Sequence, residues 1–228
     1  MRVNWSTTCT CTCWAVTGSK ALGRSGNLAG LPSTEAWLVL NERLRDLPER
    51  LCAHIDRSRA VGRELSELFG VDPERVDFAL AAHDLYRAAT PEELLSEAAR
   101  RGWEADVFER SEPLLLHGPV AALWLMQEAG VDDESVIESV TWHTTFAPNL
   151  SSVAATVFLA DKIDPDKVRR RRWLEEVRDT AYRGQYVAAV ELYLERLLTR
   201  LIKSGGIAHP RALEALNWFR LARAAATT

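Results

Sequence analysis

Imidazole and carboxylate side chains recur in this chain at positions where a helix would direct them into a core. The pair His83-Asp84 ends an apolar stripe whose residues at i, i+4 and i+7 share one helical face. His143 and Asp161 end stripes with the same offsets on two later segments. Two further histidines complete the set, one within a long amphipathic segment and one at a helix start. The candidate ligands are His54, His83, Asp84, His117, His143 and Asp161.

Such a set of buried polar groups costs free energy unless a cation or hydrogen bonds satisfy it. A single His-Asp pair is usually an ordinary core histidine beside a helix-end carboxylate, so the hypothesis rests on the combination. Imidazole and carboxylate ligands without thiolate suit iron, manganese, cobalt or zinc better than Ca²⁺ or Cu(I). Six ligands exceed the demand of one catalytic ion, which keeps open positions. We therefore expect two ions roughly 3.5–4 Å apart, bridged by a carboxylate and a hydroxide.

Helical periodicity with explicit start and stop signals runs from residue 31 onward, and no strand-like alternation interrupts it. Asp72 is a good N-cap before Pro73, and residues 90–93 (TPEE) form a capping box. A long helix over about 48–69 should close at Gly70, and its predicted core face ends at Leu68. The next helix should carry Arg87 on the same core face as His83. We predict an all-α helical bundle with a dinuclear metal site in its core, the helices starting near residues 35, 48, 73, 91, 117, 134, 152, 186 and 210.

Length and composition favour one helical domain over residues 31–225, preceded by a disordered leader over residues 1–30. The chain has 228 residues, of which 47% are hydrophobic, and its net charge of −4 creates no basic field for nucleic acid. No apolar run is long enough to span a membrane, so we expect a cytoplasmic protein, with a homodimer left open. Three of the four cysteines lie in residues 9–13 (CTCTC), which could bind a soft metal but fit an unstructured leader better. The basic run at residues 167–172 (KVRRRR) is interpreted as a solvated face.

The order of the six ligand residues resembles the HD superfamily of metal-dependent phosphohydrolases in its dinuclear form. The likeness extends over about residues 48–217 and includes His209, Pro210 and Asn217 near its end. Four segments resemble the YqeK-type branch, the symmetrical bis(5'-nucleosyl)-tetraphosphatases: residues 83–87 (HDLYR), 116–120 (LHGPV), 142–145 (WHTT) and 159–165 (LADKIDP). The resemblance implies hydrolysis of diadenosine tetraphosphate to two ADP, with a small-molecule nucleotide as substrate and no nucleic-acid or membrane partner.

The resemblance also implies roles for individual residues. One ion, most readily iron, would be held by His54, His83, Asp84 and Asp161, and the second by Asp84, His117 and His143, with Asp84 bridging. Catalysis would fall to Asp84 and Arg87, and substrate binding to Arg87, Thr144 and Thr145. The two threonines fit ordinary loop capping equally well.

This chain departs from the branch at three positions. Phe146 stands where Gly is usual, Arg87 where Lys is common, and Leu51 where Arg is frequent. Arg87 keeps a cation but presents a planar fork in place of a point charge. Phe146 could stack on a nucleobase or fill a gap between helices, and we favour the gap.

Two other functions fit the same residues. The chain could be an HD phosphohydrolase for another nucleotide, such as a nucleoside monophosphate or a guanosine alarmone. It could also be a metal-stabilised helical module that binds a nucleotide or a protein without turnover. The complete ligand set together with Arg87 argues against the module, because a degenerate HD domain would be expected to have lost ligands.

Overall fold

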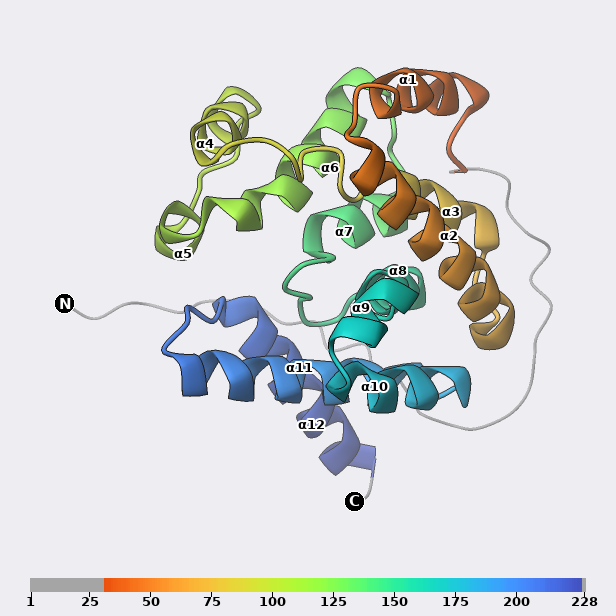
Figure 1. Cartoon of the computed structure of the whole chain (residues 1–228), viewed down its shortest axis with the longest axis vertical. Helices are drawn as coiled ribbons and strands as arrows, with labels where there is room; N and C mark the ends of the chain where they lie inside the picture. Colours follow the sequence, from red (N-terminus) through yellow and green to blue (C-terminus); the bar gives the residue numbers. More distant parts are fainter. Residues whose placement is uncertain (1–30, 227–228) are drawn as a thin grey trace.

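The computed structural model describes residues 31–226, and these residues form helices joined by short turns (Figure 1). No strand occurs among the described residues, which confirms the all-α prediction. The cysteine run at residues 9–13 lies outside the described residues. The helices are α1 (Thr34–Leu44), α2 (Glu49–Phe69), α3 (Pro73–Ala82), α4 (Pro91–Arg100), α5 (Val107–Ser111), the 3-10 helix η1 (Pro113–Leu116), α6 (His117–Glu128), α7 (Glu134–Trp142), α8 (Ser152–Lys162), α9 (Pro165–Arg170), α10 (Trp173–Tyr182), α11 (Tyr186–Ser204) and α12 (Pro210–Ala226).

The helix boundaries follow the local chemistry of the sequence. Asp72 caps α3 by accepting hydrogen bonds from the backbone N–H groups of the next turn. Thr90 and Glu93 form the expected capping box of α4. Gly70 ends α2 in the left-handed conformation with φ 65°. These caps satisfy backbone groups that a helix leaves unpaired at its ends, so they set where α2 stops and where α3 and α4 begin.

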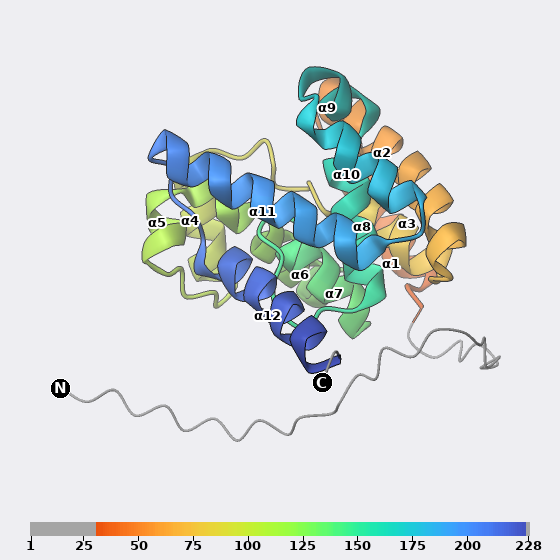
Figure 2. The same ribbon diagram turned by 90° about the horizontal axis from the view of Figure 1, so that it is seen from below.

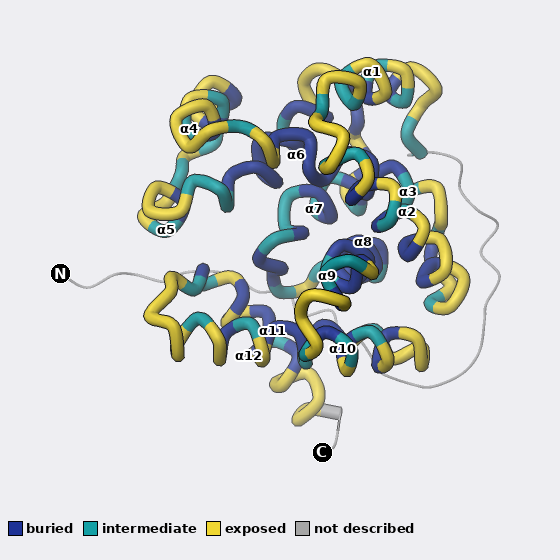
Figure 3. The backbone as a smooth tube through the Cα atoms, viewed as in Figure 1, coloured by how far each residue is buried: buried dark blue, intermediate teal, exposed yellow. Residues whose placement is uncertain are grey.

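Helix α8 lies at the centre of the molecule, and its residues from Val153 to Asp161 are all buried (Figure 3). Helices α2, α3 and α7 pack around it, while α10 and α11 pack against it as well. Helices α10, α11 and α12, which follow α9 in the chain, form one side of the molecule (Figure 2). Since every ligand-bearing helix touches α8 or a neighbour of α8, the candidate site falls inside the core.

Two predicted core positions are wrong. Helix α3 ends at Ala82, and the chain continues in tighter turns whose N–H groups bond three residues back, as from Arg87 to Asp84 at 2.9 Å. This change of period rotates Arg87 off the stripe, and its side chain is exposed. Leu68 is 45% exposed because the apolar repeat on α2 is shorter than the 3.6-residue turn and drifts around the helix.

Within residues 31–226, no helix is both long enough and apolar enough to cross a lipid bilayer.

Phe146 fills a gap between helices, as predicted. It is 2% exposed, and its ring lies 5.0 Å from that of Phe158 and 5.9 Å from that of Phe219, measured between centroids. Its backbone has φ 61°, a left-handed conformation that favours glycine. The packing of the ring therefore outweighs the backbone strain at this position.

We expect Phe146→Gly to lower the free energy of unfolding by about 1–4 kcal/mol. Relief of left-handed strain returns only about 1–2 kcal/mol, whereas truncating a buried Phe costs about 3–5 kcal/mol. Asn149→Gly is the control, since Asn149 shares the left-handed φ of 58° but is exposed. Its stability should stay within about 1 kcal/mol of the parent. Denaturant unfolding measures both, and a Phe146→Gly variant as stable as the parent would contradict the packing argument.

Candidate metal centre

Three of the candidate histidines are oriented by the same kind of hydrogen bond to the backbone. In each, the ring Nδ1 donates to the carbonyl oxygen three residues earlier, which leaves Nε2 directed into the core. The bonds run from His83 to Leu80 O at 2.7 Å, from His143 to Val140 O at 2.8 Å, and from His117 to Leu114 O. For His83 and His143 the accepting residue is the i+4 member of the stripe seen in the sequence.

The fourth histidine, His54, is oriented by a carboxylate. Its Nδ1 lies 2.6 Å from Oδ2 of Asp164, which is itself buried and held by two bonds from Arg57, at 2.9 and 3.1 Å. Sequence reasoning missed Asp164 as a site residue because an Asp before Pro is typical of a helix N-cap, and Asp164 does cap α9. The carboxylate of Asp164 also accepts hydrogen bonds from His54 and Arg57, and these contacts are visible only in three dimensions. A carboxylate behind a histidine ligand fixes its tautomer and raises its basicity.

Asp84 lies between two pairs of imidazoles. Its Oδ1 is 3.2 Å from Nε2 of His117 and 3.6 Å from Nε2 of His143. Its Oδ2 is 3.5 Å from Nε2 of both His54 and His83. The two oxygens of one carboxylate thus face different histidine pairs, which is the geometry of a bridging ligand.

Asp161 completes the cluster on one side of Asp84. Its Oδ1 lies 3.1 Å from Nε2 of His54 and 3.7 Å from Nε2 of His83. The potential ligand atoms form two groups, and within each group the atoms all lie within 4.8 Å of one another. The first group comes from His54, His83 and Asp161, and the second from His83, Asp84 and His143. His117 belongs with the second group, since its Nε2 is 2.8 Å from Nε2 of His143. The structure therefore brings together all six residues predicted from the sequence.

The donor set fits a divalent metal. The Nε2 atom of His83 is fully buried and has no hydrogen-bond partner, as expected for an atom that donates its lone pair to a cation. Burial lowers the pKa of His143 to about 3, so its imidazole is neutral and its Nε2 can coordinate. Burial alone would raise the pKa of Asp84, but the neighbouring imidazoles, His83 first, hold it well below its usual range. Neutral imidazoles and ionised carboxylates are the protonation states that bind metal.

A cavity of about 230 Å³ opens onto this cluster. Arg87 and Thr144 line it, and Thr144 Oγ1 is 3.3 Å from Nε2 of His143. Thr145 is buried and does not line the cavity. His209 lies elsewhere, with its Nε2 3.4 Å from Asp106, so it is separate from the cluster.

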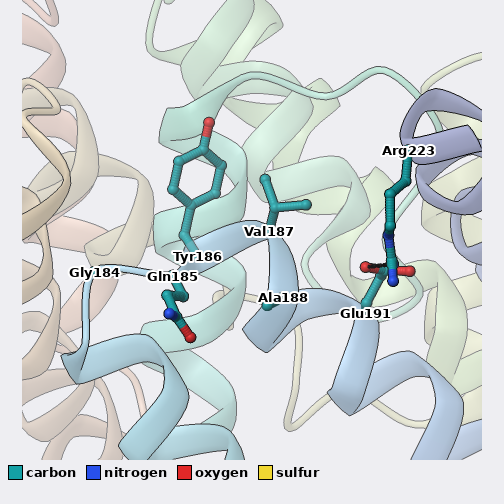
Figure 4. Close-up of a pocket in the computed structure, with 7 residues that line it drawn as sticks. All are labelled: Gly184, Gln185, Tyr186, Val187, Ala188, Glu191 and Arg223. Carbon is teal, nitrogen blue, oxygen red and sulfur yellow. Dashed lines mark hydrogen bonds and ion pairs between the residues drawn. The ribbon is translucent and has the colours of Figure 1, made fainter. Parts of the chain in front are cut away.

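A second cavity, of about 400 Å³, lies between the start of α11 and the end of α12 (Figure 4). Its charged side chains are Glu191 and Arg223, which form an ion pair with each other. It contains none of the groups of metal-binding residues found in the described part of the chain. The smaller cavity over Asp84 is therefore the candidate active site, although it has the lesser volume.

The family model for the HD domain matches residues 50–166, just over half of the chain. The chain belongs to the HD domain family. Its matched part runs from the start of α2 into α9 and contains all six clustered residues. An HD domain with this donor set is a metal-dependent phosphohydrolase, and the cluster is able to hold divalent metal.

Curated relatives of this HD protein include two named symmetrical bis(5'-nucleosyl)-tetraphosphatase. The Bacillus subtilis protein is 28% identical over 155 residues, covering 68% of this chain and 81% of its own length. The Staphylococcus aureus protein is 26% identical over 183 residues, covering 76% and 88%. A crystal structure from Clostridium acetobutylicum, described as a predicted HD superfamily hydrolase involved in NAD metabolism, matches with a TM-score of 0.74 at 23% identity. The match covers 81% of this chain and 96% of that one, and it confirms the HD fold.

We expect Asp164→Asn to weaken metal binding about 10–100-fold, because loss of a carboxylate behind a histidine ligand typically has that effect. Asp166→Asn is the matched control: Asp166 lies two residues away and pairs with Arg57 and Arg169, with no contact to His54. Competition against a chelator measures both affinities, with circular dichroism to check the fold. Equal metal retention by the two variants would contradict the role of Asp164.

Proposed function

We propose that this protein hydrolyses dinucleoside polyphosphates and cleaves diadenosine tetraphosphate symmetrically into two ADP. The observation that carries the proposal is the buried Asp84 carboxylate shared between two histidine pairs, because it provides for two cations side by side. A two-cation site suits in-line displacement at phosphorus. The relatives named symmetrical bis(5'-nucleosyl)-tetraphosphatase support the choice of substrate. A nucleotide substrate of this class is consistent with a cytoplasmic location.

In this proposal the ligands divide between two ions. His54, His83, Asp84 and Asp161 hold one, and Asp84, His117 and His143 hold the other. We propose iron, with manganese, cobalt or zinc compatible with the same imidazole and carboxylate donors. Bound divalent ions would supply Lewis-acid stabilisation of phosphoryl oxygens and an acidified water.

The remaining residues bind and position the substrate. Arg87 and Thr144 line the cavity, so the guanidinium can grip a phosphate bidentately and the hydroxyl can donate to a phosphate oxygen. Thr145 is proposed to act through the turn that presents Thr144, since its own side chain is buried behind the cavity wall. Binding of the phosphates on both sides of the scissile bond centres the polyphosphate over the site. The position of the polyphosphate then sets which bond is attacked.

We expect about two transition-metal ions per chain in protein purified without chelator, measured by elemental analysis. Asp84→Asn should abolish turnover and lose metal, because an amide cannot neutralise two cations. His83→Ala should lose metal as well. His209→Ala is the control and should retain it, because His209 contacts Asp106 outside the cluster. Folded parent protein without metal, or equal metal loss from His209→Ala and His83→Ala, would overturn the ligand assignment.

Chromatography of the products tests the reaction itself. Diadenosine tetraphosphate should give ADP as the sole nucleotide product, because its polyphosphate would be centred over the Asp84 carboxylate. Formation of AMP with ATP would refute symmetrical cleavage. Rapid phosphate release from mononucleotides, with no reaction of any dinucleoside polyphosphate, would assign the site to another HD phosphohydrolase activity.

A further inference from the structure

The basic run at residues 167–172 has two different faces. Arg169 and Arg172 are solvated, as predicted, with side chains 73% and 89% exposed beside Asp166 and Glu175. Lys167 and Arg171, by contrast, line the cavity over the metal centre, together with Lys162. Two of the five basic residues of the run are therefore part of the candidate active site.

The two lysines are already engaged with the cluster. Lys162 Nζ lies 2.6 Å from Oδ2 of Asp161, and Lys167 donates to Oδ1 of the same carboxylate. Arg171 differs, because no carboxylate among residues 31–226 lies within 4.0 Å of its guanidinium nitrogens. Its donors are available to a ligand in the cavity.

The charges that line the cavity favour a polyanion longer than one phosphate. Four cationic side chains face three carboxylates, namely Arg87, Lys162, Lys167 and Arg171 against Asp84, Glu112 and Asp161. The cations also divide between the two ends of the cluster. Arg87 follows Asp84 by one turn, whereas both lysines contact Asp161. Bound divalent ions would add further positive charge between these ends.

Arg171 also lies outside the residues matched by the HD family model, as do two apolar residues that line the same cavity, Leu174 of α10 and Tyr193 of α11. The part of the chain after α9 thus completes a cavity whose metal ligands come from the HD core. Residues added at the rim of a shared core are well placed to select among substrates of one chemistry.

We propose that Arg171, supported by Lys162 and Lys167, binds the second diphosphate half of the polyphosphate chain and so selects a four-phosphate chain over a mononucleotide. The inference rests on the proposed function and names its specificity determinant. Arg87 binds the phosphates at one end of the ligand row, and Arg171 binds those at the other. A guanidinium suits this task because its planar fork pairs with two phosphate oxygens at once.

The test compares Arg171→Gln with Arg172→Gln, which remove the same charge from adjacent exposed positions. Only Arg171 lines the cavity. The probe is a diadenosine tetraphosphate analogue with a methylene group in place of the central bridging oxygen, titrated by calorimetry into metal-loaded protein, with ADP as the shorter ligand. Thermal unfolding checks that both variants fold.

Arg171→Gln should weaken binding of the analogue about tenfold, as expected for loss of a charged hydrogen bond to phosphate. The affinity for ADP should fall less, because ADP can bind at the Arg87 end of the cavity without contacting Arg171. Arg172→Gln should change either affinity by less than about twofold, the effect of an exposed charge. Unchanged analogue binding in Arg171→Gln would overturn the inference. Equal weakening by both variants would also overturn it, because a general charge effect would then suffice.

The two proposals fail in distinguishable ways. If the parent cleaves diadenosine tetraphosphate to two ADP while Arg171→Gln binds the analogue normally, the selection by Arg171 is wrong and the proposed function stands. If the parent hydrolyses no dinucleoside polyphosphate, yet Arg171→Gln alone weakens binding of the analogue, the proposed function is wrong and the phosphate site at Arg171 stands.

Discussion

An ionised carboxylate surrounded by four imidazoles is the interaction on which the rest of this structure depends. Asp84 is 5% exposed, and burying a charge to that extent is costly unless partners compensate for it. The Nε2 atoms of His54, His83, His117 and His143 lie 3.2–3.6 Å from its two oxygens. Neutral imidazoles present lone pairs there, so a cation held between rings and carboxylate would compensate the charge. Helices α2, α3 and α7 and the start of α6 must therefore converge at one point, and the central position of α8 allows Asp161 to join them.

That convergence requires a close approach between α6 and the end of α7. A side chain at Gly118 would place its Cβ 2.8 Å from the carbonyl oxygens of Val140 and Thr141, so only glycine fits there. The same contact brings His117 and His143 within 2.8 Å of each other through their Nε2 atoms. Since each ring also donates to a carbonyl three residues earlier, the backbone fixes where both lone pairs point. The candidate metal centre is thus preorganised by main-chain geometry as much as by the side chains that cluster in it.

The chain separates two tasks between its parts. Residues 50–166, matched by the HD family model, contribute all six clustered imidazole and carboxylate residues, a set able to hold divalent metal. The cavity above them is completed by Arg171, Leu174 and Tyr193, which come from the chain after that part. Phosphoryl chemistry can then stay constant in the HD core while the later helices adapt the cavity to the length and the apolar ends of a nucleotide. This division explains why a fold match alone does not define the substrate.

The sequence by itself determined the all-α class, the starts of nine of the helices, and the six residues that cluster in the core, because caps and apolar stripes are local patterns with local physical causes. The ends of those stripes also pointed to the inward histidines, since the i+4 residue supplies the carbonyl that orients the ring. Only the tertiary structure decided the rest. Asp164 supports His54 from 110 positions away, Arg87 leaves the core face when the helix tightens, and Arg171 reaches the cavity while Arg172 does not. Such facts depend on which distant surfaces meet, and no local periodicity in the sequence records that.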